Sequence, residues 1–327
     1  MHAMSSKPLR VVLAASAIVN LILLFQVMVW KCTVETTSSD LAPIPKVILS
    51  PPIPIRPPPA PEKTQNGSLE SIIFVGGVPR SGTTLARVML DAHPDIRCGE
   101  ETRVVPRIIS MRSKWNKAGK EHERLLEAGL SDATLDQATR NFVDYIITHH
   151  GEPAKHLCNK DPLLLNYMND LQRLYPKAKF ILMIRDGRAV AHSIVTRNVT
   201  ISGVNNKDFV SAAMFWNRVV QRMTSDCKVL GREVCLPVHY EELVADPKAM
   251  MTRILSFLGV DWHDNVLRHQ EFINKGVSLS RLEPSSNQVK EAVNTAPVDK
   301  WREKLPIPLQ RQIYAEANML RELGYPQ

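Results

Sequence analysis

Cysteine is scarce in this chain, with five among 327 residues, and no two of them form a C-x-x-C pair. This spacing argues against a structural zinc site. No cluster of histidine and acidic residues has the spacing of another metal site. Aromatic residues make up only 6% of the sequence, which leaves few platforms on which nucleic-acid bases could stack. We therefore expect neither a metal nor a nucleic acid as ligand.

The remaining composition is that of a folded protein with a basic surface. Hydrophobic residues make up 44% and charged residues 23% of the chain, enough to bury a core, so disorder throughout is excluded. The formal net charge of +8 favours anionic partners such as phosphorylated cofactors, acidic peptides, anionic lipid or nucleic acid. The charge alone does not choose among them.

Residues 11–30 contain no charged residue and predict a membrane anchor. At a rise of about 1.5 Å per residue this helix spans ~30 Å, the thickness of the hydrocarbon core. A cleaved signal peptide is the alternative, but no A-x-A site follows the apolar run. Lys7 and Arg10 favour a cytoplasmic tail at residues 1–10, although Lys31 weakens the asymmetry. The rest of the chain is then lumenal.

Residues 31–70 predict a lumenal stem. Nine prolines lie between Pro43 and Pro61, and such a run is extended and semi-rigid. A ligand for a proline-reading domain is the alternative interpretation. Asn66 begins a glycosylation sequon at the end of the stem, and Asn198 begins a second one.

The catalytic domain is predicted at residues 71–327, with an α/β fold. The apolar runs at residues 71–78, 180–184 and 234–240 are typical of buried parallel strands. Strands that alternate with helices imply a P-loop-like central parallel sheet flanked by helices, with ligands at the carboxyl ends of the strands.

Three helices are predicted between and after these strands. The first covers residues 83–93 and stops before Pro94, the second begins at the capping residue Ser131 and ends before Gly151, and Pro308 opens the last. The predicted core-facing residues are Leu135, Phe142, Tyr145 and Ile146 in the second helix and Leu309, Ile313, Ala317 and Leu320 in the last.

A phosphate-binding loop follows the first strand. Gly77 and Gly82 have the spacing of a P-loop, but Thr83 stands where the lysine of that motif belongs. Backbone N–H groups at the helix start, with Arg80 inside the loop, still favour an anion over the alternative of an ordinary glycine turn. Nucleotide hydrolases need the lysine and Mg²⁺ because the transferred phosphoryl group is highly charged. A sulfuryl group carries less charge, so side-chain cations suffice without a metal.

Four segments carry a resemblance to a known family: GGVPRSGTTLARVMLDAHPDIRCGEETRVVPR, HLCNKDP, FILMIRDGRAVAHSIVTR and LEPSSNQVKEAVNTAPVDKW. In this order they resemble tyrosylprotein sulfotransferase over essentially all of residues 71–327. The resemblance implies transfer of sulfate from 3′-phosphoadenosine 5′-phosphosulfate (PAPS) to tyrosine hydroxyls in acidic segments of secreted and membrane proteins. It also implies a homodimer in the Golgi membrane, with a single type II span and the catalytic domain in the lumen.

The residues that the resemblance implies for PAPS lie in three places. Arg185 ends a strand, and Ser193 and Arg197 are four apart on the following helix, so they share one face and suit a phosphate dianion. Without the resemblance, a solvated basic helix face is an equal alternative. The 5′-phosphosulfate side matches Arg80, Ser81, Gly82, Thr83 and Thr84, and further contacts match Tyr240, Ser285, Ser286, Asn287, Gln288, Val289, Lys290, Glu291, Ala292, Val293, Asn294 and Lys300.

The resemblance also implies the catalytic residues. Glu101 matches the general base, which is needed because a tyrosine hydroxyl with a pKa of ~10 is ionised in only about one molecule in a thousand at neutral pH. Glu100 is a neighbour that the residues alone do not exclude. Arg80, Lys160 and Ser285 match the groups that stabilise the transition state. Lys160 is otherwise a lysine paired with Asp161.

The residues that match the family's contacts with the peptide acceptor are Arg103, Val104, Val105, Pro106 and Arg107. The two arginines would attract acidic residues of the acceptor.

Four lumenal cysteines permit three pairings. The resemblance implies Cys98–Cys158 and Cys227–Cys235 and leaves Cys32 over. Cys98 lies three residues before Glu101, and Cys158 lies two residues before Lys160. The first bridge is therefore expected to hold base and cation near each other.

Two other functions remain open. A carbohydrate sulfotransferase shares the cofactor chemistry and differs in its acceptor. A non-enzymatic anchored protein that binds acidic ligands would use the same basic surface but would tolerate the loss of Glu101.

Overall fold

The computed structural model describes residues 71–117, 119–293 and 298–327. Several predictions fall outside these residues: the anchor at 11–30, the stem at 31–70, Cys32, Asn66 and Asn294. Across the described residues, none of the helices combines the length and the apolar character that crossing a membrane requires.

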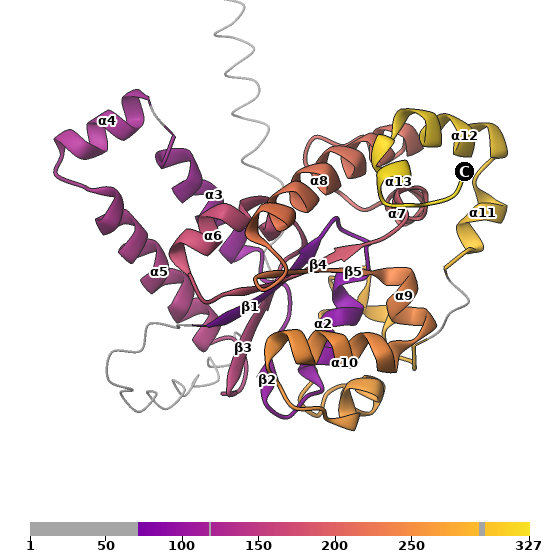
Figure 1. Ribbon diagram of the computed structural model, residues 1–327, viewed down its shortest axis with the longest axis horizontal. Coiled ribbons are helices and arrows are strands. Elements are labelled where there is room, and N and C mark those ends of the chain that lie inside the picture. The colour runs from indigo at the N-terminus through magenta and orange to yellow at the C-terminus, as the bar shows by residue number, and fades with distance from the viewer. Residues whose placement is uncertain (1–70, 118, 294–297) are drawn as a thin grey trace, which may run out of the picture. The chain divides into compact units, whose positions relative to one another are not determined.

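A parallel β-sheet forms the centre of the described residues (Figure 1). Its strand order is β2-β3-β1-β4-β5, so the first strand of the chain lies in the middle of the sheet. The strands are β1 (Ile72–Gly77), β2 (Ile96–Arg97), β3 (His156–Lys160), β4 (Lys179–Ile184) and β5 (Cys235–His239). The three predicted strands are confirmed as β1, β4 and β5. Neither β2 nor β3 was predicted, because β2 has only two residues and the β3 sequence HLCNK lacks an apolar run.

Alternate residues of β1 belong to two different cores, as a strand buried on both faces requires. Ile72 and Phe74 pack with helices on one face, and Ile73 and Val75 pack with helices on the other. Both faces of the sheet are therefore covered, and the predicted class of a parallel sheet flanked by helices is confirmed.

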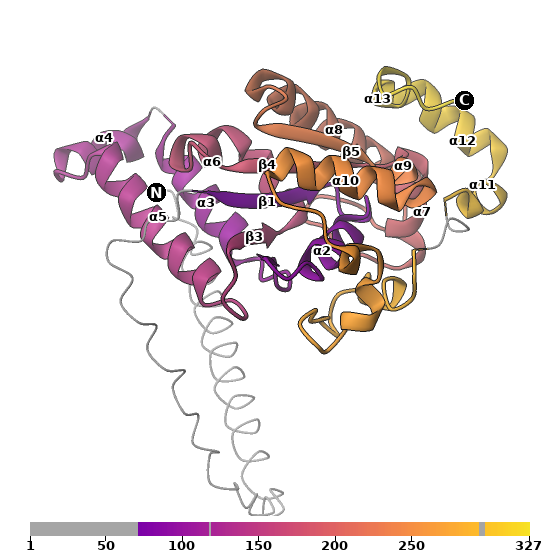
Figure 2. The same ribbon diagram turned by 60° about the horizontal axis from the view of Figure 1, so that its bottom comes forward.

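The helices fall into three groups around this sheet (Figures 1 and 2). The core that contains Ile72 and Phe74 is covered by α3 (Val104–Trp115), α5 (Asp132–Thr148), η1 (Pro162–Tyr167), α6 (Met168–Leu174) and α8 (Phe209–Leu230). The opposite core is covered by α2 (Thr83–Asp91), α9 (Tyr240–Ala245) and α10 (Pro247–Leu258). A third cluster joins α8 to α7 (Gly187–Thr196), α11 (Lys300–Lys304), α12 (Ile307–Glu316) and α13 (Asn318–Glu322). The remaining short elements are α4 (Lys120–Glu127), η2 (Asp264–Leu267), η3 (His269–Phe272) and η4 (Ser286–Gln288).

The predicted core face of α5 is correct in part: Ile146 is half-buried and packs against the core, but two other predicted residues do not. Phe142 and Tyr145 are 44% and 64% exposed, whereas Val143 and Ile147 are buried. The capping residue is correct, since the Ser131 Oγ accepts a hydrogen bond from the Thr134 N–H over 3.2 Å.

The last predicted helix is two helices in the structure. The backbone leaves the helical region at Ala317, where φ is −91° and ψ is 86°, so α12 ends and α13 begins there. Ile313, Ala317 and Leu320 are nevertheless fully buried, and Pro308 lies in the first turn of α12. The predicted apolar face is therefore largely correct although the helix is not continuous.

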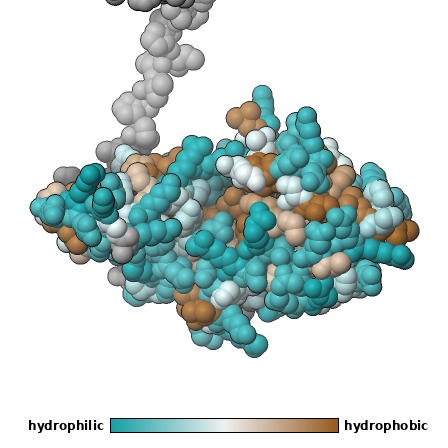
Figure 3. Space-filling view, turned by 90° about the horizontal axis from the view of Figure 1, so that it is seen from above, coloured by the Kyte–Doolittle hydropathy of each residue, from teal (hydrophilic) through white to brown (hydrophobic). Residues whose placement is uncertain are grey.

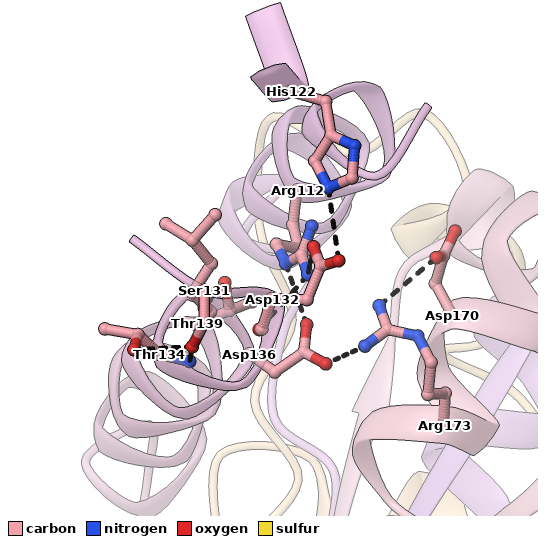
Figure 4. Close-up of polar contacts among 10 residues, drawn as sticks. Arg112, His122, Ser131, Asp132, Thr134, Asp136, Thr139, Asp170 and Arg173 are labelled. Atoms are coloured by element: carbon pink, nitrogen blue, oxygen red, sulfur yellow. Dashed lines mark hydrogen bonds and ion pairs between the residues drawn. The ribbon is translucent and has the colours of Figure 1, made fainter. Parts of the chain in front are cut away.

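An ion-pair network ties α5 to its neighbours (Figure 4). Arg112 of α3, which is buried, donates to Asp132 over 2.9 Å and to Asp136 over 2.7 Å. Arg173 of α6 pairs with Asp136, and His122 of α4 lies 3.2 Å from Asp132. These contacts fix α3, whose first residues follow Glu101, against α5 and α6.

One face of the described residues is mainly hydrophilic (Figure 3). Figure 3 shows one face on which hydrophobic residues form limited areas between hydrophilic ones. Large apolar side chains that stay exposed in the described residues include Val229, Leu282 and Ile307.

Candidate active site

The loop between β1 and α2 brings backbone N–H groups to the carboxyl end of the sheet. Gly82 caps α2 with φ at 94°, and a Cβ at this position would lie 2.4 Å from Cδ2 of Tyr240. Only glycine combines this left-handed backbone with so close a neighbour. Arg80 also has a positive φ of 80°, an uncommon conformation for a residue with a side chain. The loop is therefore held in one shape by its own residues and by Tyr240.

The side chain of Arg80 lies among the residues predicted to bind phosphate. Its Nε donates to the Ser193 Oγ over 3.0 Å, and its guanidinium also donates to the Gln288 side chain. Arg185 donates to the backbone carbonyl of Arg80 over 3.2 Å. Burial, with the charges of Arg197 and Arg185, lowers the pKa of Arg80 to about 10. This concentration of positive charge favours an anion.

The Arg185 guanidinium also stacks on an aromatic ring. Its carbon lies 4.3 Å from the centroid of the Tyr240 ring, a cation–π contact that holds the guanidinium in place. Tyr240 therefore contacts both the phosphate loop, at Gly82, and the arginine that ends β4.

A cavity of about 90 Å³ lies beside these groups. Three buried polar atoms of the same region have no hydrogen-bond partner within the described residues, namely the Ser81 Oγ, the Arg185 Nε and the Ser286 Oγ. Buried donors without partners are costly, so they indicate a polar ligand. The lining residues are Arg80, Gly82, Thr83, Thr84, Leu85, Arg185, Tyr240, Val244, Ser285, Gln288, Val289, Glu291, Ala292 and Val293.

Other residues predicted for the cofactor lie outside this lining. Asn287 and Lys290 are exposed, and Lys300 is exposed at the start of α11. Arg197 is exposed at the end of α7, yet its charge acts on Arg80.

A larger cleft of about 690 Å³ shares Arg80, Thr83, Thr84 and Ser285 with this cavity. These four residues form the boundary between the two spaces, and the Thr84 Oγ1 donates to the Ser285 Oγ over 3.1 Å across it. The phosphate loop therefore faces a small anion cavity on one side and an open cleft on the other.

A fully buried lysine, which does not itself line the cleft, lies between two carboxylates that do. Lys160 is fully buried, and its Nζ donates to the Glu101 Oε2 over 3.0 Å and to the Glu283 Oε2 over 3.2 Å. Cys98 and Cys158 form a disulfide just before Glu101 and Lys160, and Cys227 is bonded to Cys235. Both predicted pairings are confirmed.

Opposing influences act on the carboxylates of the cleft. Burial alone raises the pKa of Glu101, but the charges and hydrogen bonds of Lys160 and Arg103 together lower it below the usual value. Burial, and then the charge of Glu101, raises the pKa of Asp161 to about 7. Glu101 is therefore ionised at neutral pH, whereas Asp161 titrates there.

The structure separates Glu101 from its neighbour Glu100. Glu101 lines the cleft, whereas Glu100 lines neither cavity and acts electrostatically on His150. The adjacent pair therefore differs in position, which the sequence alone did not decide.

One wall of the cleft is a face of α3. Arg103 precedes the helix, and Arg107 and Lys114 project from it, each with an exposed side chain. Val105, which was predicted to contact the acceptor, is instead buried in the core below, and Val104 does not line the cleft. The facing walls contain apolar residues, including Leu163, Tyr167, Val199 and Ile201.

Several residues of the site were missed in the sequence. Lys114 lies seven residues after Arg107, so helical periodicity could have placed both on one face. Glu283 lies 123 residues after Lys160 along the chain, and no local signal connects the two.

The predicted sequon at Asn198 lies beside the cleft. Asn198 is exposed at a positive φ of 49° and accepts a hydrogen bond from Asn206. Val199 and Thr200 of the sequon line the cleft. Among the described residues, no group of three or more histidine, cysteine or acidic side chains is arranged to hold a metal ion.

Comparisons with known proteins agree on one family. The family model described as "Sulfotransferase family" matches residues 72–264. "Protein-tyrosine sulfotransferase 1" of Danio rerio is 50% identical over 256 residues, which are 78% of this chain and 72% of that protein. "Protein-tyrosine sulfotransferase 2" of Gallus gallus is also 50% identical over 256 residues, 78% of this chain and 69% of that protein.

Solved structures share the fold. The "Sulfotransferase Domain from the Curacin Biosynthetic Pathway" aligns with a TM-score of 0.57 at 22% identity, over 80% of this chain and 99% of that chain. The "Sulfotransferase Domain from the Synechococcus PCC 7002 Olefin Synthase" aligns with a TM-score of 0.54 at 24% identity, over 77% of this chain and 94% of that chain.

Proposed function

The chain belongs to the sulfotransferase family and, within it, to the protein-tyrosine sulfotransferases, and on this premise we propose that Glu101 is the general base of its reaction. The protein transfers a sulfuryl group from PAPS to the hydroxyl of tyrosine residues. The observation that carries our proposal is the placement of Glu101 in the lining of the cleft that borders the anion cavity, 3.0 Å from the buried Lys160.

The residues of the cavity fit PAPS. The unpaired Nε of Arg185, which lines the cavity, is a polar group that an anionic nucleotide would satisfy, and Arg80 adds a second cation to the lining. Arg185, Ser193 and Arg197 would hold the 3′-phosphate, and the loop from Arg80 to Thr84 would hold the 5′-phosphosulfate. When bound, PAPS supplies the sulfuryl group and leaves as the bisphosphate.

Glu101 removes the phenol proton while the new O–S bond forms. Such general-base assistance is worth roughly 10²–10⁴ in rate. Lys160 has three N–H donors, and among the described residues Glu101 and Glu283 accept two of them. The positive charge of Lys160, together with Arg80 and Ser285, stabilises the negative charge that develops on the sulfuryl and phosphate oxygens.

We also propose that the acceptor is an acidic segment of a membrane or secreted protein. Arg103, Arg107 and Lys114 along one wall of the cleft support this choice, because they attract carboxylates that flank the tyrosine.

We expect the enzyme to work as a homodimer in the Golgi lumen, anchored by residues 11–30. The two disulfides support an oxidising compartment. Protease protection of sealed microsomes tests the orientation, and sedimentation tests the dimer.

Incubation of the protein with ³⁵S-labelled PAPS and an acidic tyrosine peptide, without added metal, tests the base. We expect label on the tyrosine oxygen, a loss of roughly 10²–10⁴ in rate for Glu101→Gln, and unchanged binding of PAPS. Glu100→Gln is the matched control and should retain activity. A Glu101→Gln enzyme with normal turnover would refute the assignment, and transfer to a glycan but not to the peptide would indicate a carbohydrate sulfotransferase.

A further inference from the structure

Glu283 is a carboxylate whose two oxygens are both in use. Its Oε2 accepts from the Lys160 Nζ over 3.2 Å, and its Oε1 accepts from the backbone N–H of Glu101 over 3.1 Å. The side chain is 8% exposed and lies in the wall of the cleft. It therefore contacts both members of the proposed base–lysine pair.

We propose that Glu283 is a positioning residue for sulfuryl transfer, which holds Lys160 and the backbone of Glu101 in their reactive arrangement and gives Lys160 a second counterion. This inference rests on the proposed function of Glu101. Glu283 itself is not required to touch the acceptor or the transferred group.

Only a carboxylate can make both contacts. Lys160 and the N–H of Glu101 are donors, and an ionised carboxylate offers an acceptor at each oxygen. A glutamine has one acceptor and one NH₂ donor at the same positions. One of the two bonds would therefore be replaced by two donors facing each other, in a buried site where an unmade hydrogen bond is costly.

The second negative charge also affects the strength of the base. Lys160 and Arg103 are the cations that lower the pKa of Glu101, and Asp161 and Glu283 are the carboxylates beside it. The two cations stabilise the ionised form of Glu101 and weaken it as a base. Glu283 offsets part of the charge of Lys160, so Glu101 keeps more of its affinity for a proton.

The segment that carries Glu283 reaches the phosphate loop as well. Ser285 accepts from Thr84 over 3.1 Å, and Gln288 accepts from Arg80. Contacts to the base, the lysine and the phosphate loop thus lie within residues 283–288. By fixing one end of this segment, Glu283 aligns the lysine with the loop that holds the donor.

The test compares Glu283→Gln with Glu283→Asp, which keeps the charge and both acceptor oxygens. We expect Glu283→Gln to lower kcat by about 10–100-fold, with the KM for the peptide and the Kd for the product bisphosphate within about threefold of the unsubstituted enzyme. Loss of one negative charge stabilises ionised Glu101, so the acid-side midpoint of the kcat/KM profile should move to lower pH. Glu283→Asp should leave that midpoint in place and lose less rate.

A double-mutant cycle separates positioning from a merely structural role. Lys160→Met and Glu283→Gln should together cost less than the product of their separate effects on kcat, because Glu283 acts through Lys160. Glu271→Gln, which removes a carboxylate from a surface pair with Arg268, is the control and should have normal kinetics.

Three outcomes would overturn the inference. They are normal kcat in Glu283→Gln, fully multiplicative effects in the cycle, or an unshifted pH midpoint with a lowered thermal midpoint. An inactive Glu101→Gln enzyme beside a fully active Glu283→Gln enzyme would refute this inference alone. An active Glu101→Gln enzyme would instead refute the proposed base.

Discussion

Lys160 donates to Glu101 over 3.0 Å although the two residues are 59 apart in the chain. The parallel pairing of β2 with β3 sets Ile96 opposite His156 and Arg97 opposite Leu157, so the next residues in register are Cys98 and Cys158. Their disulfide continues the pairing one step beyond β2. Lys160 is the last residue of β3 and Glu101 comes four residues after the end of β2, so the covalent link between these two segments lies close to both base and lysine.

Removal of this disulfide should affect both stability and rate. The chain-entropy model gives about 4 kcal/mol for a loop of 60 residues and about 2.5 kcal/mol for one of 8 residues, as upper values. We expect Cys98→Ser/Cys158→Ser to unfold at lower urea and to lose kcat. Cys227→Ser/Cys235→Ser is the control, with a smaller loss of stability and a normal kcat. Equal kcat values in both double variants would contradict the role of the bridge in aligning the site.

Gly82→Ala should abolish cofactor binding. The new Cβ would lie 2.4 Å from Tyr240 and would need a φ of 94°, so the phosphate loop must change shape. We expect the Kd for the product bisphosphate, measured by calorimetry, to rise by at least about 100-fold, or ~2.7 kcal/mol. Gly203→Ala also needs a positive φ, of 77°, but has open space around it. It should lose some stability and retain its affinity, and a similar loss of affinity in both variants would exclude the steric explanation.

Asp161 should make the protein less stable as the pH rises. Burial, and then the charge of Glu101, raises its pKa to about 7 in the folded state, so the folded chain holds a proton that the unfolded chain releases near pH 4. The stabilisation is complete below about pH 4 and is lost as the pH rises through about 7. Asp161→Asn should therefore be more stable than the unsubstituted chain at pH 8, by up to about 4 kcal/mol, and equal to it at pH 4.

Urea unfolding at the two pH values measures this difference. Asp95→Asn is the control, because Asp95 is half-exposed and pairs only loosely with Lys155 over 3.9 Å. An Asp161→Asn variant whose stability relative to the unsubstituted chain does not change with pH would contradict the prediction.

The cations of α3 should govern the affinity for acidic peptides. Arg107→Ala and Lys114→Ala should each raise the KM for an acidic tyrosine peptide by roughly 3–10-fold at low salt and leave kcat unchanged, because their contacts are made equally before and during transfer. The effect should shrink at 0.5 M salt, where exposed charges are screened within about 4 Å. Arg124→Ala on α4 is the control. A KM that is insensitive to salt in the unsubstituted enzyme would contradict the electrostatic account.

Local sequence determined the parts of this protein whose signals lie within a few residues. The apolar run from Ile72, the glycines of the loop and the cap at Ser131 were all recognised from their own neighbourhoods, because turn chemistry and burial on both faces of a strand act over short spans. The resemblance to a known family supplied the disulfide partners, which spacing alone left open.

Tertiary structure alone decided the rest. Which face of α5 is buried depends on Arg112 and on the helices packed against it, so Val143 rather than Phe142 enters the core. The polar segment HLCNK becomes an inner strand, between β2 and β1, because Cys158 and Lys160 find partners from other segments. Glu283 meets Lys160 across 123 residues because the segment between η3 and η4 folds back onto the end of β3, and no local pattern encodes that contact.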